Sequence, residues 1–187
     1  MNLRVREINK NFDEFYKVED LYKTAFPSNE RIPLWFLMRK SKKEFIDYIA
    51  FYDNDLFVGF AYLITNNNLT FVLYLAISPE IRSIGYGTAI LSKISEKYAD
   101  NRIILNIEAD NEVASNYEER LKRKKFYLRN GYRSTGLNIF EYGQIYEVLV
   151  YGNDVSPKEY QDLFKKFIGP LLILLTNPKI SNVHHLG

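Results

Sequence analysis

The chain has 187 residues, of which 47% are hydrophobic and 16% aromatic, so it can bury the core of a single domain. Its 25 basic and 23 acidic side chains give a net charge of only +2, which argues against a broad nucleic-acid footprint. Cysteine is absent, which excludes disulfides, thiolate metal sites and acyl-cysteine intermediates. Both histidines, His184 and His185, are at the C-terminal end, so we expect no histidine-based catalytic pair and no metal site in the domain.

Targeting and membrane signals are not found. Residues 1–7 lack the apolar stretch of a signal peptide, and the apolar run at 171–175 is far too short to span a bilayer. We therefore expect a cytoplasmic protein without a membrane or nucleic-acid partner.

The first third of the chain shows strand and helix patterns in turn. Residues 3–8 alternate and predict a strand, and apolar residues at helical spacing over 12–25 predict a helix that Pro27 ends. A second, short helix is expected over 32–38, with Pro33 in its first turn.

A hairpin and a long strand follow. The apolar runs 45–52 and 56–65, separated by Asp53-Asn54-Asp55, predict the hairpin. Three asparagines at 66–68 predict another turn, which leads into a strand over 69–77.

The stretch after this strand is the most informative in the sequence. Pro79 stops the apolar run, a loop carries Arg82, Gly85 and Gly87, and a helix is expected from Thr88. Glycines before a helix leave backbone N–H groups uncovered and let the main chain approach a ligand, while the helix dipole favours an anion. The loop therefore predicts a phosphate or pyrophosphate site, with a plain strand-to-helix turn as the alternative.

Two nucleotide-binding patterns are excluded. A P-loop needs Gly-Lys-Ser/Thr, whereas Gly87 is followed by Thr88 and Ala89. A dinucleotide fingerprint needs a third glycine at the position of Ile90. The remaining pattern is Arg-x-x-Gly-x-Gly.

The second half of the chain continues the alternation of helices and strands. A helix is expected after the loop, with a buried stripe formed by Ile90, Leu91, Ile94 and Tyr98. A strand over 103–108, a charged helix over 113–130 closed by Asn130-Gly131, and strands over 132–140 and 144–151 complete the series.

A C-terminal part is expected from residue 153, after a domain over 1–152. Ser156-Pro157-Lys158-Glu159 has capping-box spacing and predicts a helix to Ile168. The apolar run at 171–175 is expected to pack back on the domain or against a partner, a second copy of the chain included, and the last residues to be disordered.

Four stretches in the same order resemble the GNAT superfamily of acyl-CoA-dependent N-acyltransferases. Its pyrophosphate loop is Gln/Arg-x-x-Gly-x-Gly/Ala, between the fourth strand and the third helix, as at 82–87. The other stretches are 22–31, 103–108 and 126–132 (Phe-Tyr-Leu-Arg-Asn-Gly-Tyr). The resemblance covers about residues 3–151. It implies an α/β fold with a mixed, mostly antiparallel sheet, splayed between its fourth and fifth strands to admit acetyl-CoA.

The resemblance also implies a donor site. The main chain of Leu75, Ala76 and Ile77 would lie beside the pantetheine arm. The pyrophosphate would be held by the loop and the first helical residues, which are Arg82, Ser83, Ile84, Gly85, Tyr86, Gly87 and Thr88.

Tyr127 falls where the family has the tyrosine that protonates the coenzyme A thiolate. The alternative is that Tyr127 is one of 15 tyrosines, packed beside Phe126. The base is less defined, because the glutamate that some members carry on the fourth strand is missing from 69–77. Glu30 and Glu108 are the remaining carboxylates, and a bound water is a third option.

The basic run of the fourth helix has several interpretations. Its members are Arg120, Lys122, Arg123, Lys124 and Lys125. We expect a solvated face paired with Glu118 and Glu119. A contact with a coenzyme phosphate and a nucleic-acid patch are the alternatives.

The sequence therefore predicts direct transfer of an acetyl group from acetyl-CoA to a primary amine. A non-catalytic acyl-CoA-binding module and a polynucleotide-phosphate binder are the competing hypotheses. The resemblance implies that the acceptor, a small molecule or a peptide, would meet segments 26–40 and 136–146. Their aromatic residues predict either an apolar cleft or core packing; they are Phe26, Trp35, Phe36, Phe140, Tyr142 and Tyr146.

Overall fold

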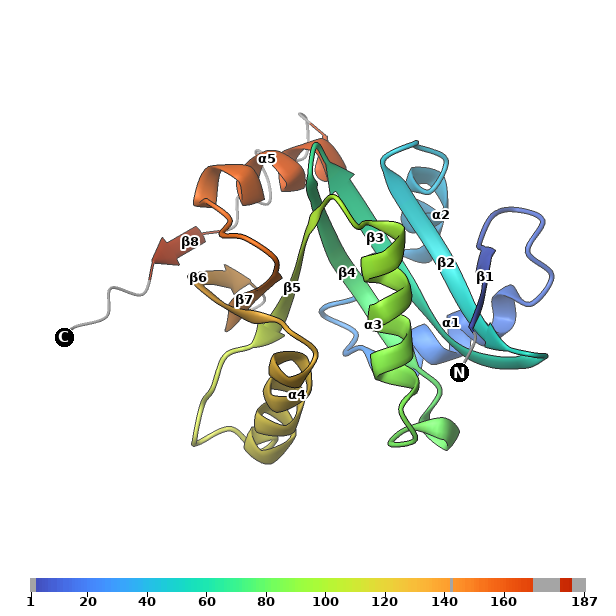
Figure 1. The fold of residues 1–187 in the computed structure, drawn as a ribbon, viewed down its shortest axis with the longest axis horizontal. Helices are drawn as coiled ribbons and strands as arrows, with labels where there is room; N and C mark the ends of the chain where they lie inside the picture. The colour runs from blue at the N-terminus through green and yellow to red at the C-terminus, as the bar shows by residue number, and fades with distance from the viewer. Residues whose placement is uncertain (1–2, 142, 170–178, 183–187) are drawn as a thin grey trace. The chain divides into compact units, whose positions relative to one another are not determined.

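The computed structural model describes residues 3–141, 143–169 and 179–182, and these fall into two units (Figure 1). The first unit comprises Met1–Thr65 and Val72–Ala99, and the second comprises Asn66–Phe71 and Asp100–Gly187. Strand β4 (Leu69–Ile77) begins in the second unit and ends in the first.

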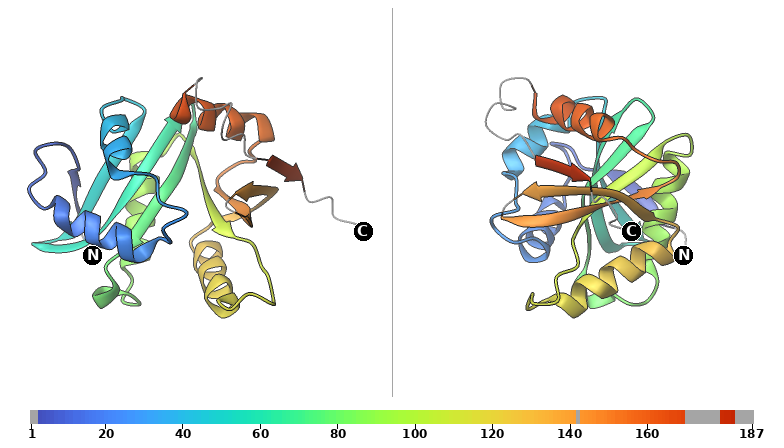
Figure 2. Two further views of the ribbon diagram at one scale, coloured as in Figure 1. Left: turned by 180° about the vertical axis from the view of Figure 1, so that it is seen from behind. Right: turned by 90° about the vertical axis from the view of Figure 1, so that its left-hand side faces the viewer.

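The first unit is a sheet with helices on both faces. Its strands are β1 (Arg4–Glu7), β2 (Ile46–Asp53), β3 (Leu56–Asn66) and most of β4 (Leu69–Ile77), and they are neighbours in that order. Helices α1 (Phe15–Ala25) and α2 (Leu34–Lys40) cover one face, and α3 (Tyr86–Lys97) covers the other, as the front and back views show (Figures 1 and 2). Most residues of β2 and β3 are therefore buried.

Antiparallel pairing and two asparagine turns fix the register of this sheet. Val5 pairs with Phe51 and Tyr48 pairs with Tyr62 across neighbouring strands. Asn54 and Asn67 both have φ of 52°, the left-handed conformation that asparagine tolerates in tight turns. The predicted hairpin and the predicted strand over 69–77 are confirmed.

The start of α3 differs from the prediction. The helix begins at Tyr86 rather than Thr88, because Gly85 is its N-cap in a left-handed conformation with φ of 97°. Ile90, Leu91 and Ile94 are buried as expected, together with Tyr86. Tyr98 instead lies at the end of the helix, half-buried, with its hydroxyl bonded to Asp47.

The second unit is built on an antiparallel sheet in the order β5, β7, β6, β8. These strands span Arg102–Glu108 (β5), Arg133–Glu141 (β6), Gln144–Tyr151 (β7) and Lys179–Asn182 (β8). Tyr146 of β7 pairs with Glu108 on one side and with Ile139 on the other. The first residues of β4 lie beside β5 as the parallel pair, so the expected mixed, mostly antiparallel α/β fold is confirmed.

Two helices complete this unit, α4 (Tyr117–Arg129) and α5 (Pro157–Ile168). Helix α4 begins four residues later than predicted, because Asn111 holds a turn by accepting the amide of Val113 (3.2 Å). Its predicted end is confirmed: Gly131 has φ of +84°, and the amide of Tyr132 bonds the carbonyl of Tyr127 (3.2 Å).

The capping box of α5 is confirmed, with both reciprocal bonds between Ser156 and Glu159. Helix α5 also packs within the second unit, where Tyr160 contacts Phe71 and accepts a hydrogen bond from Asn106 (2.7 Å). The predicted boundary at residue 152 and the predicted splay of the sheet stay predictions.

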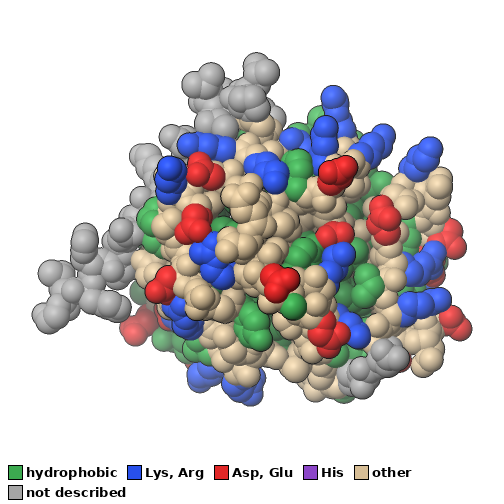
Figure 3. All heavy atoms as spheres, turned by 45° about the horizontal axis from the view of Figure 1, so that its top comes forward, with side chains coloured by type: hydrophobic (Ala, Val, Ile, Leu, Met, Phe, Trp, Pro, Cys, Tyr) green, Lys and Arg blue, Asp and Glu red, His purple; other side chains and the backbone are tan. Residues whose placement is uncertain are grey.

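The expectations for the apolar run 171–175 and the chain end lie outside the described residues, while the four-residue strand β8 was not predicted. No helix in the described part of the chain is long and apolar enough to cross a membrane. On the face shown in Figure 3, acidic and basic side chains are interspersed, so this face has no extended single-sign patch.

Candidate active site

The predicted donor loop turns the main chain sharply between β4 and α3. After Ile77, a single 3₁₀ turn (η1, Pro79–Ile81) leads to Ser83 with φ of 68° and Gly85 with φ of 97°. Both values lie in the left-handed region, which costs a non-glycine residue such as Ser83 about 1 kcal/mol or more. The loop thus places two left-handed residues directly before a helix.

The N-terminus of α3 lacks a capping side chain. The Gly85 carbonyl accepts the amide of Ala89 (3.1 Å), but Gly85 has no side chain to cover the first N–H groups of the helix. Uncapped N–H groups and the positive end of the helix dipole together suit a phosphate group. This geometry fits the sequence-based prediction for Gly85, Tyr86, Gly87 and Thr88.

Two side chains of the loop form hydrogen bonds that stabilise the conformation of the loop. Arg82 is exposed and donates from Nε to the Ile77 carbonyl (3.2 Å). Tyr86 is buried, and its hydroxyl donates to Oδ2 of Asp53 (2.8 Å). Tyr86 is therefore positioned to offer a ligand its main chain only, while its ring anchors the loop to the end of β2.

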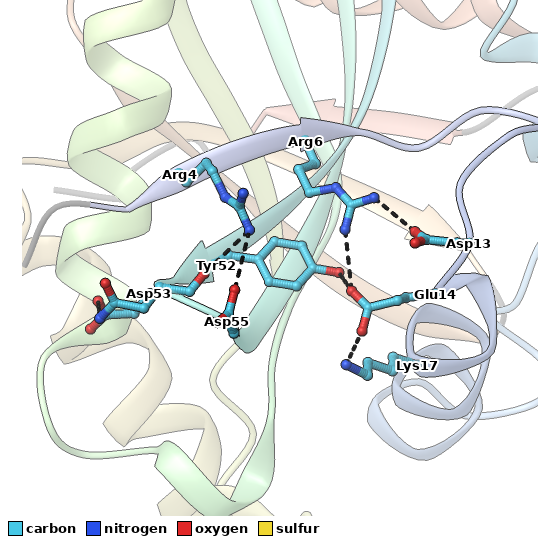
Figure 4. Close-up of polar contacts among 9 residues, drawn as sticks. Arg4, Arg6, Asp13, Glu14, Lys17, Tyr52, Asp53 and Asp55 are labelled. Carbon is cyan, nitrogen blue, oxygen red and sulfur yellow. Dashed lines mark hydrogen bonds and ion pairs between the residues drawn. The ribbon is translucent and has the colours of Figure 1, made fainter.

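The end of β2 is in turn fixed by a polar network (Figure 4). The hydroxyl of Tyr52 donates to Glu14, which also pairs with Lys17 and with Nη1 of Arg6 (3.3 Å). Lys17 and the Tyr52 hydroxyl lower the pKa of the Glu14 carboxyl, so Glu14 stays ionised. The loop thus rests on a strand end that is tied to β1 and to the start of α1.

The packing of β4, which is the strand predicted to hold the donor and is called the donor strand below, depends on one glycine of β3. Ala76 is buried, whereas Leu75 and Ile77 are half-buried on the alternate side. A Cβ built on Gly59 of β3 would lie 2.1 Å from the Ala76 carbonyl oxygen, so only glycine lets β3 approach this part of β4.

Glu30 lies in the loop between α1 and α2. Its amide bonds the Pro27 carbonyl (3.0 Å), and its carbonyl accepts the hydroxyl of Tyr74 (2.8 Å). The main chain at Glu30 is therefore held in place by β4.

Tyr127 lies on α4 in the second unit. Its ring packs edge-on against Phe126 (5.1 Å between centroids) and Tyr132 (5.6 Å). Burial raises the pKa of Tyr127 to about 12, and Arg123 opposes part of this rise. The phenol is therefore protonated at neutral pH.

Glu108 is engaged by cationic side chains. Its carboxylate pairs with Arg120 (3.0 Å) and Arg123 (2.7 Å) and accepts the amide of Asn116 (3.2 Å). Burial would raise the pKa of Glu108, but the bonds from Asn116 and Arg123 outweigh burial and leave the pKa below its ordinary value. Such a carboxylate is a poor proton acceptor, which weakens Glu108 as the predicted base.

The partners predicted for the basic run are wrong. Arg120 and Arg123 pair with Glu108, and Lys124 pairs with Asp110 (2.8 Å) and Glu147 (2.7 Å), rather than with Glu118 or Glu119. Arg120 is also buried, at 8% exposure, and not solvated. The other two members of the run, Lys122 and Lys125, line a shallow hollow of about 290 Å³ together with Leu128 and Arg129.

The site residues are divided between the two units. Leu75–Ile77, Arg82–Thr88 and Glu30 belong to the first unit, and Glu108 and Tyr127 belong to the second. In the described part of the chain, no group of three or more metal-ligating side chains is arranged to hold a metal ion. Of the aromatic residues expected around the acceptor, Trp35 and Phe140 are exposed and Tyr146 is buried, while Tyr142 lies outside the described residues.

Comparisons with known proteins find the same family that the glycine loop resembles. Residues 45–134, which contain the donor strand and the glycine loop, match the family model of the acetyltransferase (GNAT) domain. Over these residues the chain is similar to the GNAT acetyltransferase domain. No curated protein matches the chain in sequence.

Solved GNAT structures share the fold beyond that segment. A GNAT-family protein of Bacteroides thetaiotaomicron is 24% identical, with a TM-score of 0.70 over 92% of this chain and 97% of that chain. The ribosomal-protein-S18-alanine N-acetyltransferase of Escherichia coli is 13% identical, with a TM-score of 0.61 over 84% and 97%. A GNAT acetyltransferase of Elizabethkingia anophelis, solved with acetyl-CoA bound, is 15% identical, with a TM-score of 0.57 over 81% and 99%.

Three contacts of the predicted site residues were not predicted, because each joins residues far apart in the sequence. Gly59 approaches Ala76, Tyr74 bonds Glu30, and Asp53 bonds Tyr86. A glycine inside an otherwise apolar strand, as at Gly59, is the one local signal that marks a close backbone approach.

Proposed function

We propose that this protein transfers the acetyl group of acetyl-CoA directly to an amine. The proposal is carried by the uncapped N-terminus of α3, where left-handed Ser83 and Gly85 precede N–H groups that suit a pyrophosphate. It is supported by the GNAT family match over this segment and by the acetyl-CoA bound in the Elizabethkingia anophelis structure.

The donor would be held mainly by main-chain atoms of the first unit. The N–H groups from Gly85 to Thr88 would bind the pyrophosphate, and the main chain of Leu75, Ala76 and Ile77 would pair with the pantetheine arm. Acetyl-CoA supplies the activated thioester. This sequence has no cysteine on which an acyl intermediate could form, and a direct transfer requires only that the two substrates are held together.

Bonds and protons balance in a direct transfer. The neutral amine nitrogen forms a bond to the thioester carbonyl carbon, the carbon–sulfur bond breaks, and the amine gives up one proton. The products are an N-acetyl amine and coenzyme A with a free thiol.

Tyr127 would donate its O–H to the leaving sulfur. A thiol ordinarily has a pKa of about 8.5, so a phenol with a pKa near 12 is protonated when the thiolate forms. The same difference favours a hydrogen bond to sulfur over complete proton transfer, unless the pKa of the phenol falls in the complex. Of the predicted bases, Glu30 or a bound water fits better than Glu108, because two arginines already neutralise Glu108.

The experiment is a screen of small amines and peptides for release of free thiol from acetyl-CoA. With an active acceptor, Tyr127→Phe should lower kcat about 100-fold, the lower end of general-acid effects, while acetyl-CoA binding is retained. Tyr117→Phe on the same helix is the matched control and should keep full turnover. Unchanged kcat in Tyr127→Phe would remove the assignment.

A non-catalytic acyl-CoA-binding module is the second candidate. It is favoured by the absence of a carboxylate from 69–77 and by the engagement of Glu108. Acetyl-CoA binding without thiol release across the whole amine panel would support it over the enzyme.

A further inference from the structure

Four buried tyrosines of the first unit gather beneath the α1–α2 loop, residues 26–33. None is more than 5% exposed, and they come from α1, β2, β3 and β4; they are Tyr22, Tyr48, Tyr62 and Tyr74. Tyr22 packs edge-on against Tyr74 (4.9 Å between centroids), and Tyr48 packs against Tyr62 (5.0 Å). The cluster therefore brings several phenol groups into one apolar layer.

Tyr74 bridges two main-chain groups of this loop. Its hydroxyl donates to the Glu30 carbonyl (2.8 Å) and accepts the amide of Ile32 (3.1 Å). The hydroxyl of Tyr22 donates to the Ile32 carbonyl (2.9 Å), so both main-chain groups of Ile32 are bonded to tyrosines. These bonds involve no side chain of the loop, and the path of the loop is therefore set by the tyrosines beneath it.

Tyr74 also belongs to the donor strand. It immediately precedes Leu75, and its ring is on the buried side of β4 together with Ala76. One short stretch of β4 thus fixes the α1–α2 loop through a side chain, while its main chain at 75–77 is the proposed partner of the pantetheine arm. A shift of the Tyr74 hydroxyl would move the loop relative to the donor strand.

We propose that Tyr74 is a positioning residue that sets the distance between the α1–α2 loop and the donor strand, and thereby the binding of the acceptor amine. The inference rests on the proposed acetyl transfer. Tyr74 acts through the main chain of Glu30 and Ile32 and does not touch the reacting atoms.

The test compares Tyr74→Phe with Tyr48→Phe. Both changes remove one hydroxyl from the same buried cluster, but the Tyr48 hydroxyl has no hydrogen-bond partner in the described part of the structure. Three quantities are measured: the amide hydrogen exchange over residues 28–33, the KM for an active amine and the Kd for acetyl-CoA.

Loss of the two bonds in Tyr74→Phe should speed exchange of the Ile32 amide about tenfold and raise the KM for the amine about fivefold, as expected for hydrogen bonds of ordinary strength. The Kd for acetyl-CoA should stay within about twofold, because the glycine loop is not altered. Tyr48→Phe should match the wild type in all three measurements. Tyr22→Phe leaves the Tyr74 hydroxyl in place as the acceptor of the Ile32 amide and should give a smaller increase in exchange at Ile32.

The proposal is overturned if Tyr74→Phe leaves both the Ile32 exchange and the amine KM unchanged, or if Tyr48→Phe shows the same effects. Faster exchange with an unchanged KM would also overturn it, because the bonds would then be structural only. Failure of the proposed function looks different: the wild type would release no thiol with any amine, whatever the exchange rates.

Discussion

The α1–α2 loop of the first unit and the β5–α4 connection of the second are held by different chemistry. In the first unit, buried tyrosine hydroxyls bond the main chain at Glu30 and Ile32. In the second, arginine and lysine side chains of α4 neutralise Glu108 and Asp110. A connection held by ion pairs commits its carboxylates to structure, and this counts against Glu108 as the proposed base.

The largest effect is expected from a substitution that disturbs the close approach of β3 to β4 in the first unit. Gly59→Ala places a methyl group 2.1 Å from the Ala76 carbonyl, so β3 and β4 must separate, which should lower the free energy of unfolding by about 3 kcal/mol or more. Urea unfolding of the wild type and variant measures the loss.

Gly136→Ala is the matched control for this change. A Cβ at Gly136 meets no atom within 4 Å, and its positive φ of 73° should cost only about 1 kcal/mol. Equal losses in the two variants would show that close approach to Ala76 is not what Gly59 provides.

The next largest effect is expected from removal of the ion pairs that Glu108 forms in the second unit. Glu108→Gln leaves Arg120, 8% exposed, without its carboxylate, and should lower the free energy of unfolding by about 2 kcal/mol. If Glu108 has this structural role only, kcat with an active amine should hardly change.

Glu112→Gln, at an exposed position before α4, is the control and should leave stability unchanged. A large loss of kcat in Glu108→Gln, with stability intact, would instead restore Glu108 as the base and contradict the comparison of the two carboxylates.

The smallest effect concerns a pH-dependent ion pair at the start of α5. Hydrogen bonds from Arg102 and Ser156 lower the pKa of Glu159 to about 2, below its unfolded value. A lowered folded-state pKa gives stability that is present above the unfolded pKa of about 4.3 and is lost as pH falls toward 2. Glu159→Gln should therefore have a lower Tm than the wild type at pH 7, and this difference should shrink below pH 4. A difference that is as large at pH 2.5 as at pH 7 would contradict this reasoning.

Elements whose signals are local could be predicted from the sequence. The asparagine turns at 54 and 67, the Gly131 cap and the capping box at Ser156 each depend on a few neighbouring residues, and all four are observed. The first residues of helices are harder to predict. Helix α3 begins after Gly85 because Gly85 adopts a left-handed conformation, which the sequence does not specify.

Contacts between distant residues could not be predicted. Tyr74 bonds residues 42 and 44 positions away, and Tyr86 bonds Asp53 across 33 positions. Arg123 lies four residues after Glu119 on α4, yet it pairs with Glu108, because tertiary packing brings this half-buried carboxylate to 2.7 Å. Folding decides such pairings, so a run of charges alone indicates the helix and not its partners.

Calorimetric titration of acetyl-CoA tests the central claim most directly. The wild type should bind at one site, and Gly85→Val should abolish binding, because a side chain at φ of 97° distorts the loop and covers the N-terminus of α3. Gly152→Val, with a similar φ of 101° at a position outside the proposed site, should bind as the wild type does. Absence of binding by the wild type, or equal binding by Gly85→Val, would contradict the account.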